Sequence, residues 1–222
     1  PAGSKVSFNI TEVRSPSSPT GATSLAKCIT KNAQGEVIDR VGFESFSFEM
    51  PAIGSGALSG KKAFATAVDT PAYTDEAVVS FTTAGGVPVG GSIRVSLPEV
   101  VSSQAGWVVS SGTSVEFGSP SLSAPLVNGA DVNVTSGGRV VEFAISENEL
   151  GQGVEVVFTI SHVTTPTRQV GSASETSIWT YDSLGNIIDS ASDVSTDAIT
   201  VGDLTGVPVS YTHLTLPTIY SV

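Results

Sequence analysis

One stretch of this 222-residue sequence occurs twice, and that repeat limits the possible folds more than any other feature. Residues 6–39 align with residues 156–189 at a constant offset of 150 positions, without a gap. The offset superimposes alternating apolar residues, a proline and a Gly-x-[Val/Ile]-Ile-Asp turn in one register. Because chance rarely aligns three such features together, we interpret the stretch as an internal repeat and predict a tandem array with units of about 150 residues.

The repeat also divides the chain. We expect residues 1–54 to be the C-terminal part of a preceding β-sandwich unit, residues 55–60 to be a linker, and residues 61–206 to be one complete unit. The linker sequence, SGALSG, consists mostly of glycine and serine, which is typical of flexible connections. Its counterpart VGDLTG, at residues 201–206, marks the expected end of the second unit.

The end of the chain needs a separate explanation. Residues 208–222, and above all VSYTHLTLPT at 209–218, resemble the conceptual in-frame translation of a transposon-end sequencing adapter. We therefore interpret residues 207–222 as an artefactual tail of a metagenomic sequence and leave them out of the fold prediction.

The hydrophobic periodicity indicates strands almost everywhere. Apolar and polar residues alternate at period two, as in residues 77–83 and 92–97, and clusters of Gly, Pro, Asn, Asp and Ser separate the alternating segments. We expect hairpins at 107–117 and at 132–145, and at most one helical turn, at 146–153. The pattern predicts an all-β protein.

The charge excludes one class of partner. The formal net charge is −11 and only ten residues are Lys or Arg, scattered along the chain. Binding to nucleic acid is therefore excluded, because neutralising phosphates requires clustered basic residues. A run of about 20 apolar residues is also absent, so we predict no membrane span in this fragment.

The sequence does not indicate catalysis. His162 lacks the nearby pair of a serine and an acid that a hydrolytic triad requires, and its counterpart in the repeat is Glu12, so we interpret it as a solvated strand residue. Glu147, Glu149 and Glu155 are interpreted as solvated carboxylates rather than as an acid–base pair. The cysteine and the histidines are not clustered in the sequence as the ligands of a zinc site would be. We therefore predict no catalytic, cofactor-binding or metal-ligating residue and expect that the protein is not an enzyme.

Calcium binding is the alternative for the acidic residues near the ends of the second unit. Junctions between tandem sandwiches can gather carboxylates and backbone oxygens, which suit a hard cation. The residues concerned are Asp69, Asp75, Glu76, Asp193, Asp197 and Asp203. We interpret them mainly as a solubilising surface, with calcium as the possible cofactor.

Five further side chains have two possible roles. Cys28, the single cysteine, aligns with an isoleucine of the second copy, so we expect a small buried residue, with an intermolecular disulfide as the alternative. Trp107 and Trp179 could stack on a sugar, but we interpret both as packing residues. Asn9 and Asn133 lie in N-x-[Ser/Thr] sequons and are possible N-glycosylation sites of a glycoprotein secreted by a eukaryote.

Two segments resemble a known class of repeats. They are FTTAGGVPVGGSIRVSLPE (81–99) and VEFAISENELGQGVEVVFTISHVTTPT (141–167). They are similar to tandem immunoglobulin-like β-sandwich repeats of extracellular surface and filament proteins in algal, protist or prokaryotic plankton. The resemblance implies antiparallel β-sandwiches in a rod or filament, and it implies no catalytic residue.

These observations lead to a structural hypothesis. We expect a subunit of an extracellular filament, appendage or surface layer, located outside the cell or on its surface, whose partners are copies of itself in a homopolymer. The first unit supplies too few strands to close a sandwich, so its apolar faces require a partner. The alternative is an adhesin or glycan-binding module of a cell-surface stalk, whose partners are glycans.

Overall fold

The structure of the protein is a computed structural model that describes residues 7, 9–13, 15–16, 19–26, 28–41, 48–98, 106–119 and 132–202. These residues form strands, turns and irregular segments without a helix, which confirms the predicted all-β class. None of the described residues therefore belongs to a helix that could cross a membrane. The segment interpreted as an artefactual tail, 207–222, lies outside the described residues.

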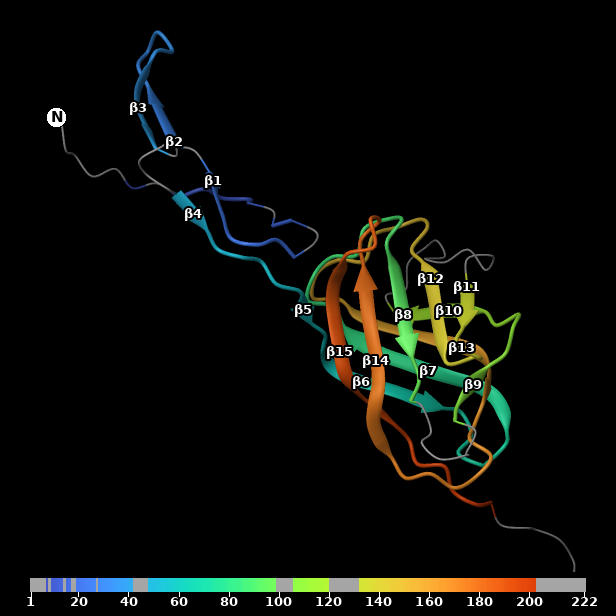
Figure 1. Ribbon diagram of the computed structural model, residues 1–222. Helices are drawn as coiled ribbons and strands as arrows, with labels where there is room; N and C mark the ends of the chain where they lie inside the picture. The colour runs from blue at the N-terminus through green and yellow to red at the C-terminus, as the bar shows by residue number, and fades with distance from the viewer. Residues whose placement is uncertain are drawn as a thin grey trace, which may run out of the picture.

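Most of the described strands belong to one mixed sheet of 11 strands (Figure 1). Its order is β10-β13-β7-β6-β15-β14-β8-β12-β11, with β5 attached to β15 and β9 attached to β13. The strands are β5 (Gly56–Ala57), β6 (Ser59–Thr66), β7 (Thr74–Thr82), β8 (Ser92–Ser96), β9 (Val108–Val109), β10 (Val115–Ser119), β11 (Val132–Thr135), β12 (Val140–Ala144), β13 (Glu155–Thr164), β14 (Ala173–Tyr181) and β15 (Ile187–Thr196). Neighbouring strands are antiparallel, except that β15 runs parallel to β5 and β6.

The sheet folds back on itself into two layers. One layer contains β15, β14, β8, β12 and β11, and the other contains β6, β7, β13 and β10; Figure 1 shows the strands of the two layers crossing at a steep angle. Strand β6 pairs with β7 in one layer and with β15 in the other, so it joins the layers through hydrogen bonds. The result is barrel-like on this side, whereas an immunoglobulin-like sandwich would keep two separate sheets.

Aromatic side chains from both layers meet in the core. The period-two alternation places Phe143 of β12 and Phe158 of β13 inside, where each is at most 1 % exposed. Their ring centroids are 5.0 Å apart in an edge-to-face arrangement, and Phe117 of β10 lies 5.4 Å from Phe158. Such pairs contribute about 0.5–1.5 kcal/mol beyond the area that they bury, so the cluster holds the layers together.

The predicted hairpin at 107–117 is wrong, and the one at 132–145 is confirmed by the pairing of β11 with β12. Strands β9 and β10 both pair with β13, one after the other along the same edge. The reason is a bulge in β13, where His162 has a φ of +56° and the register shifts. The connection between β9 and β10 loops around this bulge and is held by the Ser114 amide, which donates to Ser161 Oγ at 2.8 Å.

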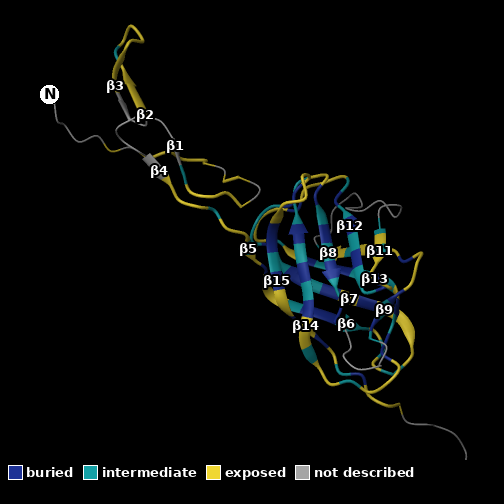
Figure 2. Ribbon diagram, in the orientation of Figure 1, coloured by how far each residue is buried: buried dark blue, intermediate teal, exposed yellow. Residues whose placement is uncertain are grey.

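The N-terminal strands form two small antiparallel sheets, which pair β1 (Thr23–Ala26) with β4 (Phe48–Met50) and β2 (Cys28–Lys31) with β3 (Val37–Val41). Figure 1 shows both sheets away from the 11-stranded sheet, and Figure 2 shows the β2–β3 hairpin mainly exposed. Residues 55–60, expected to link two units, contribute β5 and the start of β6 to the main sheet, and Leu58 is buried there.

Candidate functional site

The C-terminal hairpin, β14–β15, has a turn that is fixed by its own residues. Asp182 Oδ1 accepts hydrogen bonds from the amides of Leu184 and Asn186, at 2.9 and 2.8 Å. Gly185 has a φ of +81°, a conformation that favours glycine because it has no Cβ. Hydrogen bonds from Asn186 and from neighbouring amides lower the pKa of the Asp182 carboxyl.

The N-terminal hairpin, β2–β3, repeats this arrangement 150 residues earlier. Asn32 Oδ1 accepts from the amides of Gln34 and Glu36, at 3.1 and 2.8 Å, and Gly35 has a φ of +86°. The cross-strand pairs Cys28↔Val41, Ile29↔Arg40, Thr30↔Asp39 and Lys31↔Val37 are those of β14–β15 at the same offset: Ile178↔Ala191, Trp179↔Ser190, Thr180↔Asp189 and Tyr181↔Ile187. The matching segments thus share turn geometry and register.

The repeat extends to an unusual backbone position. Glu12 and His162, which align in the two copies, both have positive φ, +60° and +56°. Side chains with a Cβ rarely adopt this conformation, so its occurrence at matching positions argues against coincidence.

In the second copy, a buried carboxylate ties the hairpin to the rest of the sheet. The Asp189 side chain is fully buried and accepts hydrogen bonds from the amides of Ala84 and Gly85, at 3.1 and 3.0 Å. Gly56 of β5 packs so closely against this carboxylate that a Cβ there would overlap it. Burial raises the pKa of the Asp189 carboxyl, and the two amides oppose that shift.

In the first copy, the matching carboxylate is exposed. The Asp39 amide donates to Thr30 Oγ1 at 3.0 Å, as the Asp189 amide does to Thr180 Oγ1 at the same distance. The Thr30 hydroxyl in turn donates to Asp39 Oδ2 at 3.2 Å. Within the described part of the chain, no loop comparable to Ala84–Gly85 covers Asp39, which stays exposed.

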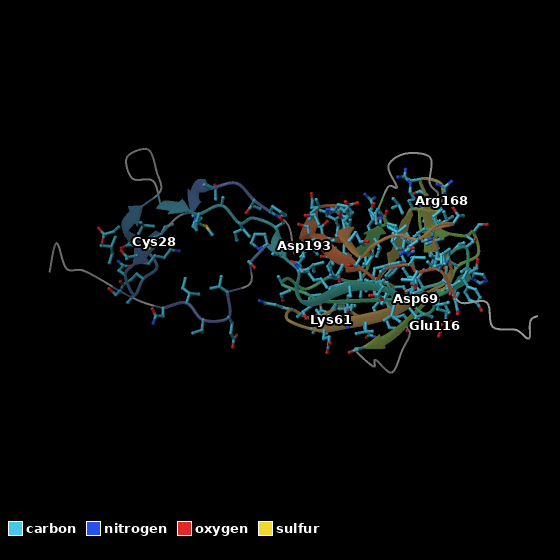
Figure 3. All side chains as sticks on the ribbon, turned by 90° about the horizontal axis from the view of Figure 1, so that it is seen from below. Cys28, Lys61, Asp69, Glu116, Arg168 and Asp193 are labelled. Carbon is cyan, nitrogen blue, oxygen red and sulfur yellow. The ribbon has the colours of Figure 1, made fainter. Side chains whose placement is uncertain are left out.

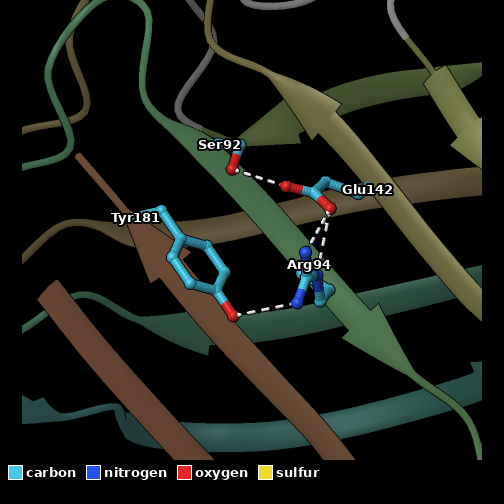
Figure 4. A network of polar contacts seen from close by, with 4 residues as sticks. All are labelled: Ser92, Arg94, Glu142 and Tyr181. Carbon is cyan, nitrogen blue, oxygen red and sulfur yellow. Dashed lines mark hydrogen bonds and ion pairs between the residues drawn. The ribbon is translucent and has the colours of Figure 1, made fainter. Parts of the chain in front are cut away.

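A second polar arrangement lies on the outward face of β8, β12 and β14 (Figure 4). Arg94 donates from Nε and Nη2 to Glu142 Oε2, at 3.0 and 2.7 Å, and from Nη1 to the Tyr181 hydroxyl at 3.3 Å. The Ser92 hydroxyl donates to Glu142 Oε1 at 3.1 Å. The hydrogen bond to Glu142 is the main cause that raises the pKa of Arg94, whose guanidinium also lies 5.1 Å from the centroid of the Tyr181 ring.

The residues singled out from the sequence as candidates for chemistry do not come together. His162, Glu147, Glu149 and Glu155 are all exposed, as their interpretation as solvated residues required. A hydrogen bond of 3.0 Å joins His162 Nδ1 and Ser161 Oγ, and the tautomer of the imidazole decides which atom donates.

The two sequon asparagines are both accessible. Asn9 is exposed in an irregular segment, and Asn133 is exposed in β11, opposite Glu142 of β12. Their exposure is compatible with modification, which stays a prediction.

The carboxylates considered for calcium are spread over the surface. Figure 3 shows Asp69 and Asp193 well apart, and Asp193 forms an ion pair with Lys62 at 2.6 Å, which lowers the pKa of the carboxyl. The described residues contain no group of three His, Cys, Asp or Glu side chains that could hold a metal ion. Asp203 lies outside them.

Two predictions about packing residues need separate answers. Trp107 is a core residue, as predicted, with 2 % of its surface exposed, but Trp179 is only half-buried and lies on the outward face of β14. The prediction that Cys28 is buried is wrong, because it is a free and exposed cysteine in β2. Its counterpart Ile178 is buried by strands that β2 lacks among the described residues.

The sequence interpretation missed Asp189 and the group around Arg94. The repeat did contain a signal for the first, since Ile38-Asp39 recurs as Ile188-Asp189, but the signal for burial lay in the tertiary neighbours. The pairing of Arg94 with Glu142 required the strand order, because the two residues are 48 positions apart.

Comparison with known proteins gives little further information. The chain matches no family model and no curated protein. Among solved structures it is similar to the crystal structure of BslA, a bacterial hydrophobin, at 15 % sequence identity and a TM-score of 0.34, over 60 % of this chain and 94 % of that chain. A similarity at that TM-score carries no argument about function.

Proposed function

We propose that this protein is a structural subunit of an extracellular filament, appendage or surface layer. It is built from tandem β-sandwich repeats of immunoglobulin-like type that associate with copies of the same protein. Its role is mechanical and not catalytic, and it acts outside the cell or on the cell surface.

The observation that carries this proposal is the state of the N-terminal hairpin. Ile38 of β3 is 63 % exposed, and Cys28 of the paired strand β2 is exposed as well. At the positions that match Cys28 and Ile38, Ile178 and Ile188 are 0 % and 8 % exposed. Burying an aliphatic side chain of this size stabilises a structure by about 1.5–3 kcal/mol, so an assembly that covered the N-terminal hairpin would gain several kcal/mol.

The C-terminal hairpin shows how such covering works. Strand β8 pairs with the free edge of β14, and β5 and β6 pair with the edge of β15. The β2–β3 hairpin has the same register, and among the described residues no third strand pairs with either of its edges. Unpaired edges with apolar faces are the features through which β-proteins associate, and a rod of such units would use them along its length.

Self-association can be tested on the full chain. We expect the mass measured by light scattering to rise with protein concentration, and electron micrographs of concentrated samples to show ordered filaments or sheets. Substituting Ile38→Ser should shift assembly to at least about tenfold higher concentration, which corresponds to about 1.4 kcal/mol. Leu184→Ser is the matched control. Leu184 is 85 % exposed in the turn of the other hairpin, so its substitution should leave the concentration needed for assembly unchanged.

The single cysteine supplies an internal probe. Cys28 lies within the hairpin and is the only thiol of the chain, so a maleimide reports on that surface alone. Labelling should be fast in dilute monomer and at least about tenfold slower in the assembled state. A protein that stays monomeric at all concentrations, or that assembles while Cys28 keeps its monomer labelling rate, would contradict the proposal.

A further inference from the structure

The outward face of β8, β12 and β14 contains a shallow depression whose lining is not required by the fold. Its volume is about 360 Å³, within the range of about 300–1,000 Å³ of small-molecule sites. The lining side chains are Arg94, Ser96, Thr135, Ser136, Val140, Trp179 and Tyr181. The register brings Trp179 directly opposite Arg94, and Arg94 directly opposite Glu142, so a row of an aromatic ring, a cation and an anion crosses three strands.

The polar groups of this row are held in place before any ligand arrives. Glu142 Oε2 receives two of the five N–H groups of Arg94, and the Tyr181 hydroxyl receives a third. The Arg94 side chain is nevertheless 40 % exposed and that of Glu142 is 31 % exposed, so both present atoms to solvent. The Tyr181 hydroxyl accepts from Arg94 and can still donate its own proton (Figure 4).

The internal repeat separates what the hairpin needs from what this surface adds. The residues that shape the hairpin recur in both copies: Thr30 and Thr180, Gly35 and Gly185, Asp39 and Asp189. The outward aromatic residues do not recur, because Ile29 and Lys31 stand where Trp179 and Tyr181 stand in the second copy. The aromatic pair is therefore not a condition for forming the hairpin.

We propose that this depression binds a neutral oligosaccharide of hexopyranose units. The ring of Trp179 offers a flat π-surface to the C–H face of a sugar. The hydrogens of that face carry a partial positive charge, which the negative face of the ring attracts. Arg94, Ser96 and the Tyr181 hydroxyl, which line the depression, then supply donors and acceptors for the sugar hydroxyls, and Glu142 holds Arg94 in position. The inference is independent of self-association, since it concerns a different surface.

The charge of the site selects the class of sugar. The carboxylate of Glu142 compensates the guanidinium of Arg94, so the site has no excess positive charge for an acidic sugar. The whole chain has a formal net charge of −11, which repels uronic-acid and sulfated polysaccharides at low salt. The same charge also disfavours nucleic acid, because it repels the phosphate groups.

Tryptophan fluorescence and calorimetry of the full chain test this proposal. Cellohexaose, laminarihexaose, mannohexaose and chitohexaose are titrated separately, with polygalacturonate hexamer as the acidic probe. We expect at least one neutral hexamer to bind with a dissociation constant below about 1 mM and to change the emission of Trp179. The acidic hexamer should bind at least about tenfold more weakly than that neutral sugar at low salt.

The repeat also supplies the variants. Trp179→Ile and Tyr181→Lys install the residues of the N-terminal hairpin at matching positions, so the hairpin should keep its fold, which circular dichroism and thermal unfolding check. Trp179→Ile should weaken binding at least about tenfold and remove the change in emission. Tyr73→Ser, at an aromatic residue that is 48 % exposed elsewhere on the surface, is the control and should bind as the unaltered protein does.

Three results would overturn the inference. They are the absence of binding by all four neutral hexamers below about 1 mM, tighter binding of the acidic hexamer than of any neutral one, and equal losses in Trp179→Ile and Tyr73→Ser. A folded Trp179→Ile variant that keeps its full affinity would likewise show that the sugar binds elsewhere.

Discussion

The β2–β3 and β14–β15 hairpins have nearly the same local structure but different tertiary surroundings. Their turns use the same side-chain cap, Asn32 in one and Asp182 in the other, and their strands pair in the same register. Yet β14–β15 lies between β8 and β6 in the main sheet, whereas β2–β3 pairs only within itself among the described residues. Local residues therefore determine the hairpin, and tertiary neighbours determine whether it is buried.

The difference is clearest at two aspartates. Asp39 and Asp189 occupy the same place relative to the threonine across the strand pair, but one is exposed and the other has no exposed surface. The same local structure thus contains a solvated carboxylate in one copy and, in the other, a buried carboxylate that accepts hydrogen bonds from two amides. Substitutions at matched positions of the two hairpins measure what the neighbours contribute.

The largest contrast is expected for apolar residues on the inner face. Ile178→Ala should lower the free energy of unfolding by about 2–5 kcal/mol, because it leaves a cavity in the core. Cys28→Ala, at the matching position, should change it by no more than about 0.5 kcal/mol, since Cys28 is exposed. Urea unfolding of monomer, followed by tryptophan fluorescence, measures both values. Equal effects would mean that the N-terminal hairpin is buried as well.

The aspartates should give the next largest contrast. Asp189→Asn places an amide group where the Ala84 and Gly85 amides need an acceptor, and we expect a loss of about 1–3 kcal/mol in the free energy of unfolding. Asp39→Asn should be close to neutral in dilute solution, because the side chain is exposed. The same urea titration measures the free energy of unfolding of both variants. A loss of similar size in Asp39→Asn would contradict the expected difference between the two aspartates.

The pH dependence of Asp189 has a defined sign. Burial raises the pKa of its carboxyl above the ordinary value of 3.8, so the folded protein binds this proton more tightly than the unfolded chain. The stability that the shift contributes is present below the unfolded pKa and is lost as the pH rises through the folded pKa. The difference in unfolding free energy between the unaltered protein and Asp189→Asn should therefore be greatest at low pH and shrink as the pH rises.

The turn glycines should behave alike in the two copies. Gly35 and Gly185 both have positive φ and open space around the position of a Cβ, so alanine costs only the backbone strain, about 1–2 kcal/mol at each site. Amide hydrogen exchange at Glu36 and Asn186, whose amides bond to the turn cap, reports the local loss in each hairpin. A cost at only one of the two sites would show that the turns differ.

The strands were predictable to the extent that their signals are local. Period-two alternation identified β7 and β8, and Ser136-Gly137-Gly138 identified the turn between β11 and β12, because positive φ at these residues favours glycine. The failure at 107–117 has a non-local cause. The segment resembles a hairpin, but the bulge at His162 of β13 gives each of its strands the same partner.

The functional surfaces were less predictable for the same reason. Trp179 has an apolar counterpart in Ile29, which suggested packing, and only the strand order shows that it faces outward beside Arg94. Cys28 was expected to be buried because it aligns with Ile178, but alignment of a hairpin says nothing about the strands beside it. Repeated residues reveal shared local structure, and differing surroundings must be read from the fold.

The smallest effect is expected where one copy already contains the substitution. Asp182→Asn gives the C-terminal turn the cap that Asn32 provides in the N-terminal turn, and the same Oδ1 atom can accept both amides. We expect a change of less than about 0.5 kcal/mol at neutral pH, against about 1–2 kcal/mol for Asp182→Ala, which removes the acceptor. Since the pKa of Asp182 is lowered in the folded protein, its contribution is lost as the pH falls through the folded value, and Asp182→Asn should lack that loss. Urea titrations at several pH values measure both variants, and a large cost for asparagine would show that the charge, and not the geometry of the cap, holds this turn.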